Sequence, residues 1–136
     1  MSDTVVSTLS TLTTFTAADG ENLAVQDWPL LEGTSRGTVL LVHGLGEHVG
    51  RYDALARRLN AWGFAVRGYD QYGHGESGGP RGGLTGEMRL LDDLADMVDA
   101  TRARMAAHQP LVLLGHSMGG LVAARFVSMH LRPVDA

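Results

Sequence analysis

The sequence predicts an α/β fold in which an N-terminal antiparallel hairpin precedes a mostly parallel sheet. Two apolar runs without alternation, Thr38–Val42 and Leu111–Leu114, are typical of strands covered on both faces. Each run leads into a Gly-rich turn and then a helical pattern, and such alternation favours parallel strands. With 136 residues, of which 44% are hydrophobic and 19% charged, we expect residues 1–136 to belong to one globular domain.

The hairpin is predicted at the start of the chain. Thr11–Thr16 is rich in β-branched residues, and Leu23–Trp28 roughly alternates between apolar and polar positions. Asp19 and Gly20 lie between the two runs and form a common turn pair. Pro29–Gly37 is interpreted as a loop that leads to the first parallel strand.

A first amphipathic helix is predicted over Arg51–Trp62. Its apolar residues recur at helical spacing, and Gly63 is a typical residue just past a helix end. The predicted buried face consists of Tyr52, Leu55, Ala56, Leu59 and Trp62. Phe64–Tyr69 then predicts a short strand, which runs into a glycine-dense loop over Asp70–Pro80.

A second, longer helix is predicted from about Thr85 to Ala107. Its apolar stripe consists of Met88, Leu91, Leu94, Val98 and Met105. The acidic residues of this segment, Asp92, Asp93, Asp96 and Asp99, lie mostly outside that stripe. This pattern favours a solvated helix face over a metal site.

The predicted strand Leu111–Leu114 is followed at once by Gly115-His116-Ser117-Met118-Gly119, a G-x-S-x-G motif. A helix-like run from Met118 to about Leu131 comes next. Strand, sharp turn with a central Ser, and helix together form the context of a nucleophile elbow. Ser117 is therefore the candidate nucleophile, and the Met118 N–H is a candidate donor to a developing oxyanion.

Composition narrows the function classes. The net charge is −4 and basic residues form no block, so we expect no nucleic-acid partner. The absence of Cys excludes disulfides, a thiol nucleophile and a zinc finger. The first twenty residues have neither a basic start nor a long apolar run, so we expect a cytoplasmic protein with no integral membrane segment.

Three motifs in order carry a family resemblance. They are HGLGEH at His43–His48, continued by Gly50-Arg51-Tyr52; DQYGHGES at Asp70–Ser77; and GHSMGG at Gly115–Gly120. From about residue 10 to its end the chain resembles the α/β-hydrolases, most closely the serine aminopeptidase-like branch of monoacylglycerol lipases and lysophospholipases.

The resemblance implies a serine hydrolase for carboxylic esters, such as monoacylglycerols or lysophospholipids, that uses no cofactor or metal. It assigns Ser117 as the nucleophile and the N–H groups of Met118 and Leu45 as the oxyanion hole. It also implies that His43 and His74 shape loops.

The family places its catalytic acid and His after the nucleophile. Here only His130 and Asp135 follow Ser117, in the reverse order, and His130 is about 20 Å along the predicted helix. We therefore expect the N-terminal portion of an α/β-hydrolase domain, ending before the sixth strand and lacking the catalytic Asp and His. Alone it should be inactive, and an unpaired apolar edge at Leu111–Leu114 should favour self-association.

Two other interpretations stay open. A dinucleotide-binding domain would explain Gly44, Gly46 and Gly50 after a buried strand, with Asp70 about twenty residues further on. Against it, the hairpin comes first and the elbow is unexplained. A non-catalytic α/β interaction module would keep the fold and give Ser117 no role. A metal site is disfavoured because the spacing from His43 to His48 does not match a known zinc motif.

Overall fold

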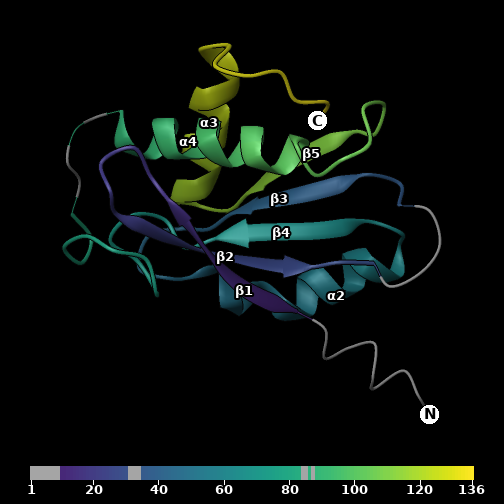
Figure 1. Ribbon diagram of the computed structural model, residues 1–136, viewed down its shortest axis with the longest axis horizontal. Coiled ribbons are helices and arrows are strands. Elements are labelled where there is room, and N and C mark those ends of the chain that lie inside the picture. Colours follow the sequence, from purple (N-terminus) through teal and green to yellow (C-terminus); the bar gives the residue numbers. More distant parts are fainter. Residues whose placement is uncertain (1–9, 31–34, 84–85, 87) are drawn as a thin grey trace.

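A computed structural model describes residues 10–30, 35–83, 86 and 88–136. They form one mixed sheet in the strand order β1-β2-β4-β3-β5, with helices on both faces (Figure 1). The strands are β1 (Thr11–Thr16), β2 (Asn22–Trp28), β3 (Thr38–Val42), β4 (Ala65–Tyr69) and β5 (Leu111–Gly115). β3 pairs in parallel with β4 on one side and with β5 on the other. The predicted α/β fold is confirmed.

The N-terminal hairpin also forms as predicted. β1 and β2 pair antiparallel, with Thr11 opposite Asp27, and β2 continues antiparallel onto β4. The turn between β1 and β2 is closed by a hydrogen bond from the Ala17 N–H to the Glu21 carbonyl. Gly20 supplies the positive φ of 89° that this turn needs.

The sheet separates the core into two layers, and helices cover each of them. The helices are η1 (Val49–Tyr52), a 3₁₀ turn, followed by α2 (Asp53–Ala61), α3 (Arg89–Arg102) and α4 (Met118–Ser128). α2 packs on one face of the sheet, and α3 and α4 cover the other (Figure 1). Successive β3 side chains point to opposite faces, so Leu41 packs in the α2 layer and Leu40 in the other. This explains why β3 is apolar from Val39 to Val42.

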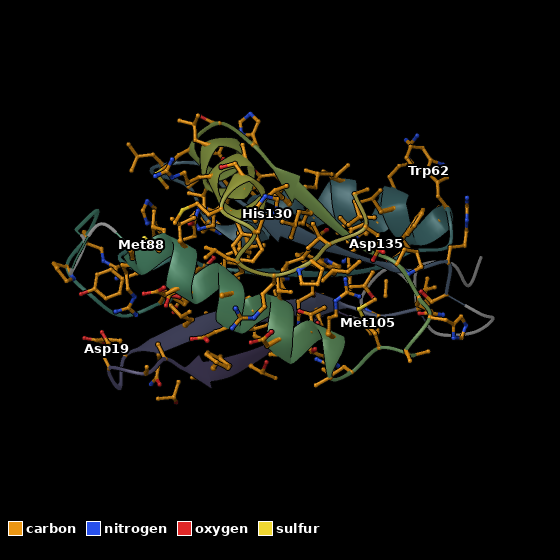
Figure 2. All side chains as sticks on the ribbon, turned by 90° about the horizontal axis from the view of Figure 1, so that it is seen from above. Asp19, Trp62, Met88, Met105, His130 and Asp135 are labelled. Atoms are coloured by element: carbon orange, nitrogen blue, oxygen red, sulfur yellow. The ribbon has the colours of Figure 1, made fainter. Side chains whose placement is uncertain are left out.

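The first predicted helix is shorter than expected and buries a narrower face. It begins as η1 and becomes α-helical only at Asp53. Ala56 and Leu59 are buried, but Leu55 is 36% exposed and Trp62 is 55% exposed. Trp62 lies past the last helical turn, and Figure 2 shows its side chain pointing away from the body of the molecule. The predicted five-residue face is therefore wrong at Leu55 and Trp62.

The second predicted helix ends early, and one of its acidic residues is buried. α3 stops at Arg102 because the next residues form a turn, with Met105 N–H bonded to the Arg102 carbonyl. Thr85, the predicted start, lies outside the described residues. Asp93 is 3% exposed and pairs with Arg89 Nε at 2.8 Å, so the prediction of a solvated face is wrong at Asp93. Among the described residues, no acidic or histidine cluster could hold a metal ion.

The edge strand β5 differs from the prediction in two ways. Leu111 is buried, but residues 112–114 are only half-buried, so this strand is not covered on both faces. The predicted unpaired edge is wrong at two positions, because the Asp135 N–H bonds the Leu111 carbonyl and the Leu113 N–H bonds the Ala136 carbonyl, both at 2.9 Å. Within the described ranges, no helix is long and apolar enough to span a membrane.

Candidate active site

The predicted elbow forms at the carboxyl end of β5. Ser117 lies between the strand and α4 as the N-cap residue of that helix, with φ 57° and ψ −121°. A residue other than Gly rarely adopts a positive φ, so the backbone at Ser117 is strained. Its side chain is exposed. The structure therefore presents a serine hydroxyl at a helix N-terminus, on a turn between two packed elements.

Two glycines allow close backbone contacts at the elbow. A Cβ added to Gly119 would lie 1.9 Å from the carbonyl oxygen of Val42, and one added to Gly115 would lie 2.5 Å from the carbonyl oxygen of Gly119. The His116 N–H donates to that same Val42 oxygen at 3.1 Å. Since a side chain at either glycine would overlap backbone, both positions require Gly, as the sequence predicts.

The loop after β3 lies beside Ser117. Val42 is opposite Gly115 in the parallel register, so the two strands end at the same edge. A Cβ on Gly44 would lie 3.1 Å from the Ser117 Cβ. Leu45 comes next and is 67% exposed. In the described part of the chain, neither the Leu45 N–H nor the Met118 N–H donates a hydrogen bond to another protein group, which leaves both free for a ligand.

His43 shapes this loop from inside the protein. Its Nδ1 lies 2.7 Å from the Gly44 carbonyl, and its Nε2 accepts the Gln71 N–H at 2.9 Å. Because Nε2 accepts, the proton is on Nδ1, and both ring nitrogens are occupied. The Gln71 side chain returns a hydrogen bond to the His43 carbonyl at 2.7 Å. Burial lowers the pKa of His43, which favours this neutral form.

Glu47 holds the same loop from the solvent side. Its Oε1 accepts the Gly44 N–H at 2.6 Å and the Tyr52 hydroxyl, and His116 Nδ1 lies 3.6 Å away. Burial opposes ionisation of Glu47, but the hydrogen bonds from Tyr52 and Gly44 outweigh it and lower the carboxyl pKa. Sequence reasoning assigned roles to neither Glu47 nor Gln71. Only the presence of Glu47 in the HGLGEH motif pointed to it.

The Asp70–Ser77 motif builds the neighbouring loop after β4. The Asp70 carboxylate accepts the N–H groups of Val49 and Glu76, each at 2.8 Å. Ser77 donates to the Asp70 carbonyl and accepts the Ala24 N–H at 2.8 Å. Both Asp70 carboxylate oxygens are thus engaged inside the protein, which argues against the dinucleotide interpretation because that interpretation needs a free acid for a ribose.

The residues after α4 do not reach the elbow. His130 follows the end of α4, is exposed and has φ 54° (Figure 2). Asp135 instead accepts the Leu111 N–H at 2.8 Å and pairs with Arg102 at 3.3 Å. His130 therefore follows the end of α4 that lies opposite Ser117, and Asp135 is bonded to Leu111 at the start of β5.

Comparison with known proteins decides the family. Residues 33–136, which include the β3 loop and the elbow, match the model of the serine aminopeptidase S33 family of hydrolases. The chain belongs to this family. The resemblance inferred from the three motifs is confirmed.

Relatives and solved structures agree with this assignment. The chain is 38% identical to mouse monoglyceride lipase over 106 residues and 42% identical to the monoacylglycerol lipase of Mycolicibacterium smegmatis over 85 residues, which are 78% and 62% of this chain. These matches span 34% and 30% of the relatives, so the chain corresponds to about a third of their length.

Among solved structures, a soluble variant of the Saccharomyces cerevisiae monoglyceride lipase superposes with a TM-score of 0.79 at 30% identity. This match covers 88% of the chain and 40% of the yeast enzyme. A carboxyl esterase from Bacillus coagulans also has a TM-score of 0.79, at 28% identity, and covers 89% of the chain and 40% of that enzyme. Nearly all of this chain therefore has the fold of the corresponding part of these two enzymes.

Proposed function

We propose that the protein to which this chain belongs hydrolyses carboxylic esters by nucleophilic acyl transfer, with Ser117 as the attacking group. The observation that carries the proposal is the backbone of Ser117, strained at φ 57° and ψ −121° while the side chain is exposed. Such strain persists only where the surrounding structure enforces it, and it is common at active sites. The Ser117 Oγ would bond to the ester carbonyl carbon, and its proton would pass through a base to the alcohol oxygen as the ester C–O bond breaks. Water would then cleave the acyl group from Ser117 as the free acid.

We assign the oxyanion hole to the N–H groups of Leu45 and Met118. Leu45 lies in the loop after β3, Met118 begins the helix that follows the neighbouring parallel strand β5, and the residue before Leu45 packs against Ser117. Met118 is the first residue of α4, where the helix dipole favours negative charge. Two backbone donors of this kind stabilise the tetrahedral intermediate of acyl transfer.

The proposed substrate is a lipid ester of the monoacylglycerol or lysophospholipid type. Support comes from the names of the relatives, which are monoglyceride and monoacylglycerol lipases in animals, yeast and bacteria. We assign residues 1–136 to the N-terminal portion of one α/β-hydrolase domain in the cytoplasm. We further propose that the catalytic base and its acid come from outside these residues. In support, both ring nitrogens of His43 are occupied, His130 lies beyond α4, and His116 Nδ1 lies 3.6 Å from Glu47 Oε1.

Ester hydrolysis by the full-length gene product is the test. Wild type should cleave p-nitrophenyl esters, and Ser117→Ala should lose almost all of this rate. Ser128→Ala is the matched control, because Ser128 is an exposed serine at the other end of α4. Equal rates in wild type and Ser117→Ala would contradict the proposal.

A fluorophosphonate probe separates the hydrolase from a non-catalytic module. The full-length protein should be labelled at Ser117, whereas a folded protein that resists labelling would support the interaction module. Residues 1–136 alone should hydrolyse esters at a negligible rate, because an unactivated serine is a weak nucleophile. Sedimentation of this chain tests whether the half-buried residues 112–114 of β5 cause self-association.

A further inference from the structure

The carboxylate of Glu47 lies where three segments of the candidate site meet. One oxygen, Oε1, accepts the Gly44 N–H from the β3 loop and the Tyr52 hydroxyl from η1. His116, from the elbow, places its Nδ1 3.6 Å from the same oxygen. The Glu47 side chain is 15% exposed, whereas that of His116 is 66% exposed. A single half-buried carboxylate thus connects the loop, the 3₁₀ turn and the residue before Ser117.

The bond from Gly44 to Glu47 fixes the start of the next peptide unit. Because the Gly44 N–H is committed to Glu47 at 2.6 Å, it is not available to a substrate. The Gly44 Cα is also confined, since a Cβ there would lie 3.1 Å from the Ser117 Cβ and 3.2 Å from Glu47 Oε1. The peptide that carries the Leu45 N–H begins at the Gly44 Cα. This atom is therefore held by Ser117 on one side and by Glu47 on the other.

We propose that Glu47 is a positioning residue that holds the Gly44–Leu45 peptide so that the Leu45 N–H points at the oxyanion formed on attack by Ser117. This inference rests on the proposed function of Ser117. A carboxylate close to a developing negative charge is unfavourable in itself. The Tyr52 hydroxyl and the Gly44 N–H both donate to Glu47 Oε1, and these bonds disperse its charge.

Kinetics of the full-length protein test the role. Glu47→Ala should lower kcat by about 10- to 100-fold with KM within about twofold, since loss of a whole oxyanion donor costs about 100- to 1,000-fold in kcat. Glu47→Gln keeps an acceptor oxygen and should retain most of the wild-type kcat. Glu76→Gln is the matched control, because Glu76 is an exposed glutamate in the loop after β4. If Glu47→Ala lowers kcat no more than Glu76→Gln does, Glu47 has no positioning role.

A spectroscopic measurement on the same variants needs no turnover. Burial and the hydrogen bond to Glu47 raise the pKa of Tyr52 to about 12. Glu47→Ala should move the phenolate absorbance step of Tyr52 toward its ordinary pKa of 10.0, with Tyr52→Phe identifying that step among the other tyrosines. An unchanged Tyr52 titration overturns the network. Absence of ester hydrolysis in wild type instead refutes the proposed function, and the positioning role with it, whatever Tyr52 does.

Discussion

Two loops meet at the carboxyl end of the sheet, and they hold their shapes by different means. Polar side chains fix the loop after β3: Glu47 caps the Gly44 N–H, and His43 is bonded on both ring nitrogens. The turn after β5 depends instead on the absence of a Cβ at Gly115 and Gly119, because backbone atoms of neighbouring segments lie in contact there. The free energy of unfolding should therefore fall when a hydrogen bond is removed from the first loop. In the second loop it should fall when a single methyl group is added.

The largest expected effect is on the turn after β5. Gly119→Ala would place a Cβ 1.9 Å from the Val42 oxygen and 2.5 Å from the His43 oxygen. β3 pairs on both sides and cannot move away, so we expect a loss of at least about 3 kcal/mol in the free energy of unfolding. Urea unfolding measures it.

Gly120→Ala is the matched control for that substitution. The neighbouring glycine has no contact closer than 3.4 Å for an added Cβ, and it lies inside α4. Since Ala is preferred to Gly in a helix by about 1 kcal/mol, Gly120→Ala should keep or raise stability. Equal destabilisation by the two substitutions would show that the turn does not depend on close backbone contact.

A smaller loss is expected in the loop after β3. Gln71→Ala removes the 2.7 Å bond to the His43 carbonyl, and Gln71 is fully buried. Leaving a buried carbonyl unpaired costs about 1–3 kcal/mol, so unfolding should become easier by about 2 kcal/mol. Gln109→Ala, which breaks a bond to the Ser35 carbonyl in a half-buried setting, should cost less. If Gln71→Ala lowers the free energy of unfolding no more than Gln109→Ala does, the His43 carbonyl does not depend on the bond from Gln71.

These two loops also show what the sequence can predict. The elbow can be predicted from neighbouring residues, because an apolar strand pattern precedes Ser117, a helical pattern follows it and a glycine lies two residues away on each side. The partners of Glu47 and His43 cannot be found this way. Gln71 is 28 residues from His43, and the two meet only because β3 and β4 are neighbours in the sheet.

Errors in the predicted helices have the same physical origin. Asp93 lies outside the apolar stripe, yet it is buried because it pairs with Arg89 one turn earlier. Trp62 fits the helical periodicity, yet it is exposed and follows the last residue of α2, Ala61. Periodicity reports which residues share a face of a helix. It does not report where the helix ends or which charges are paired.

The pH dependence of stability should report the buried His43. Its folded pKa lies below the ordinary 6.5, so above pH 6.5 its contribution to stability is fully present. As the pH falls below 6.5, the unfolded chain binds a proton that the folded chain does not, and stability falls by at most about 1.4 kcal/mol per pH unit. NMR of the imidazole nitrogens should show less than half of His43 protonated at pH 6.5. Half-protonation at pH 6.5 would contradict the buried, doubly bonded ring.

The smallest predicted change is a gain in stability at Ser117 itself. A non-Gly residue at φ 57° and ψ −121° costs about 1–3 kcal/mol, and Gly adopts such angles freely. Gly also loses about 0.5–1 kcal/mol more conformational entropy on folding, so Ser117→Gly should raise the free energy of unfolding by about 1 kcal/mol. Ser117→Ala keeps the Cβ and the strain, and its stability should stay close to wild type. Both variants lack the hydroxyl and should be equally inactive in the full-length protein. If Ser117→Gly is less stable than Ser117→Ala by about 0.5–1 kcal/mol, the turn is unstrained, because only the entropy cost of Gly then remains. A gain in stability confined to Ser117→Gly would show that the strained backbone at Ser117 lowers the stability of the fold.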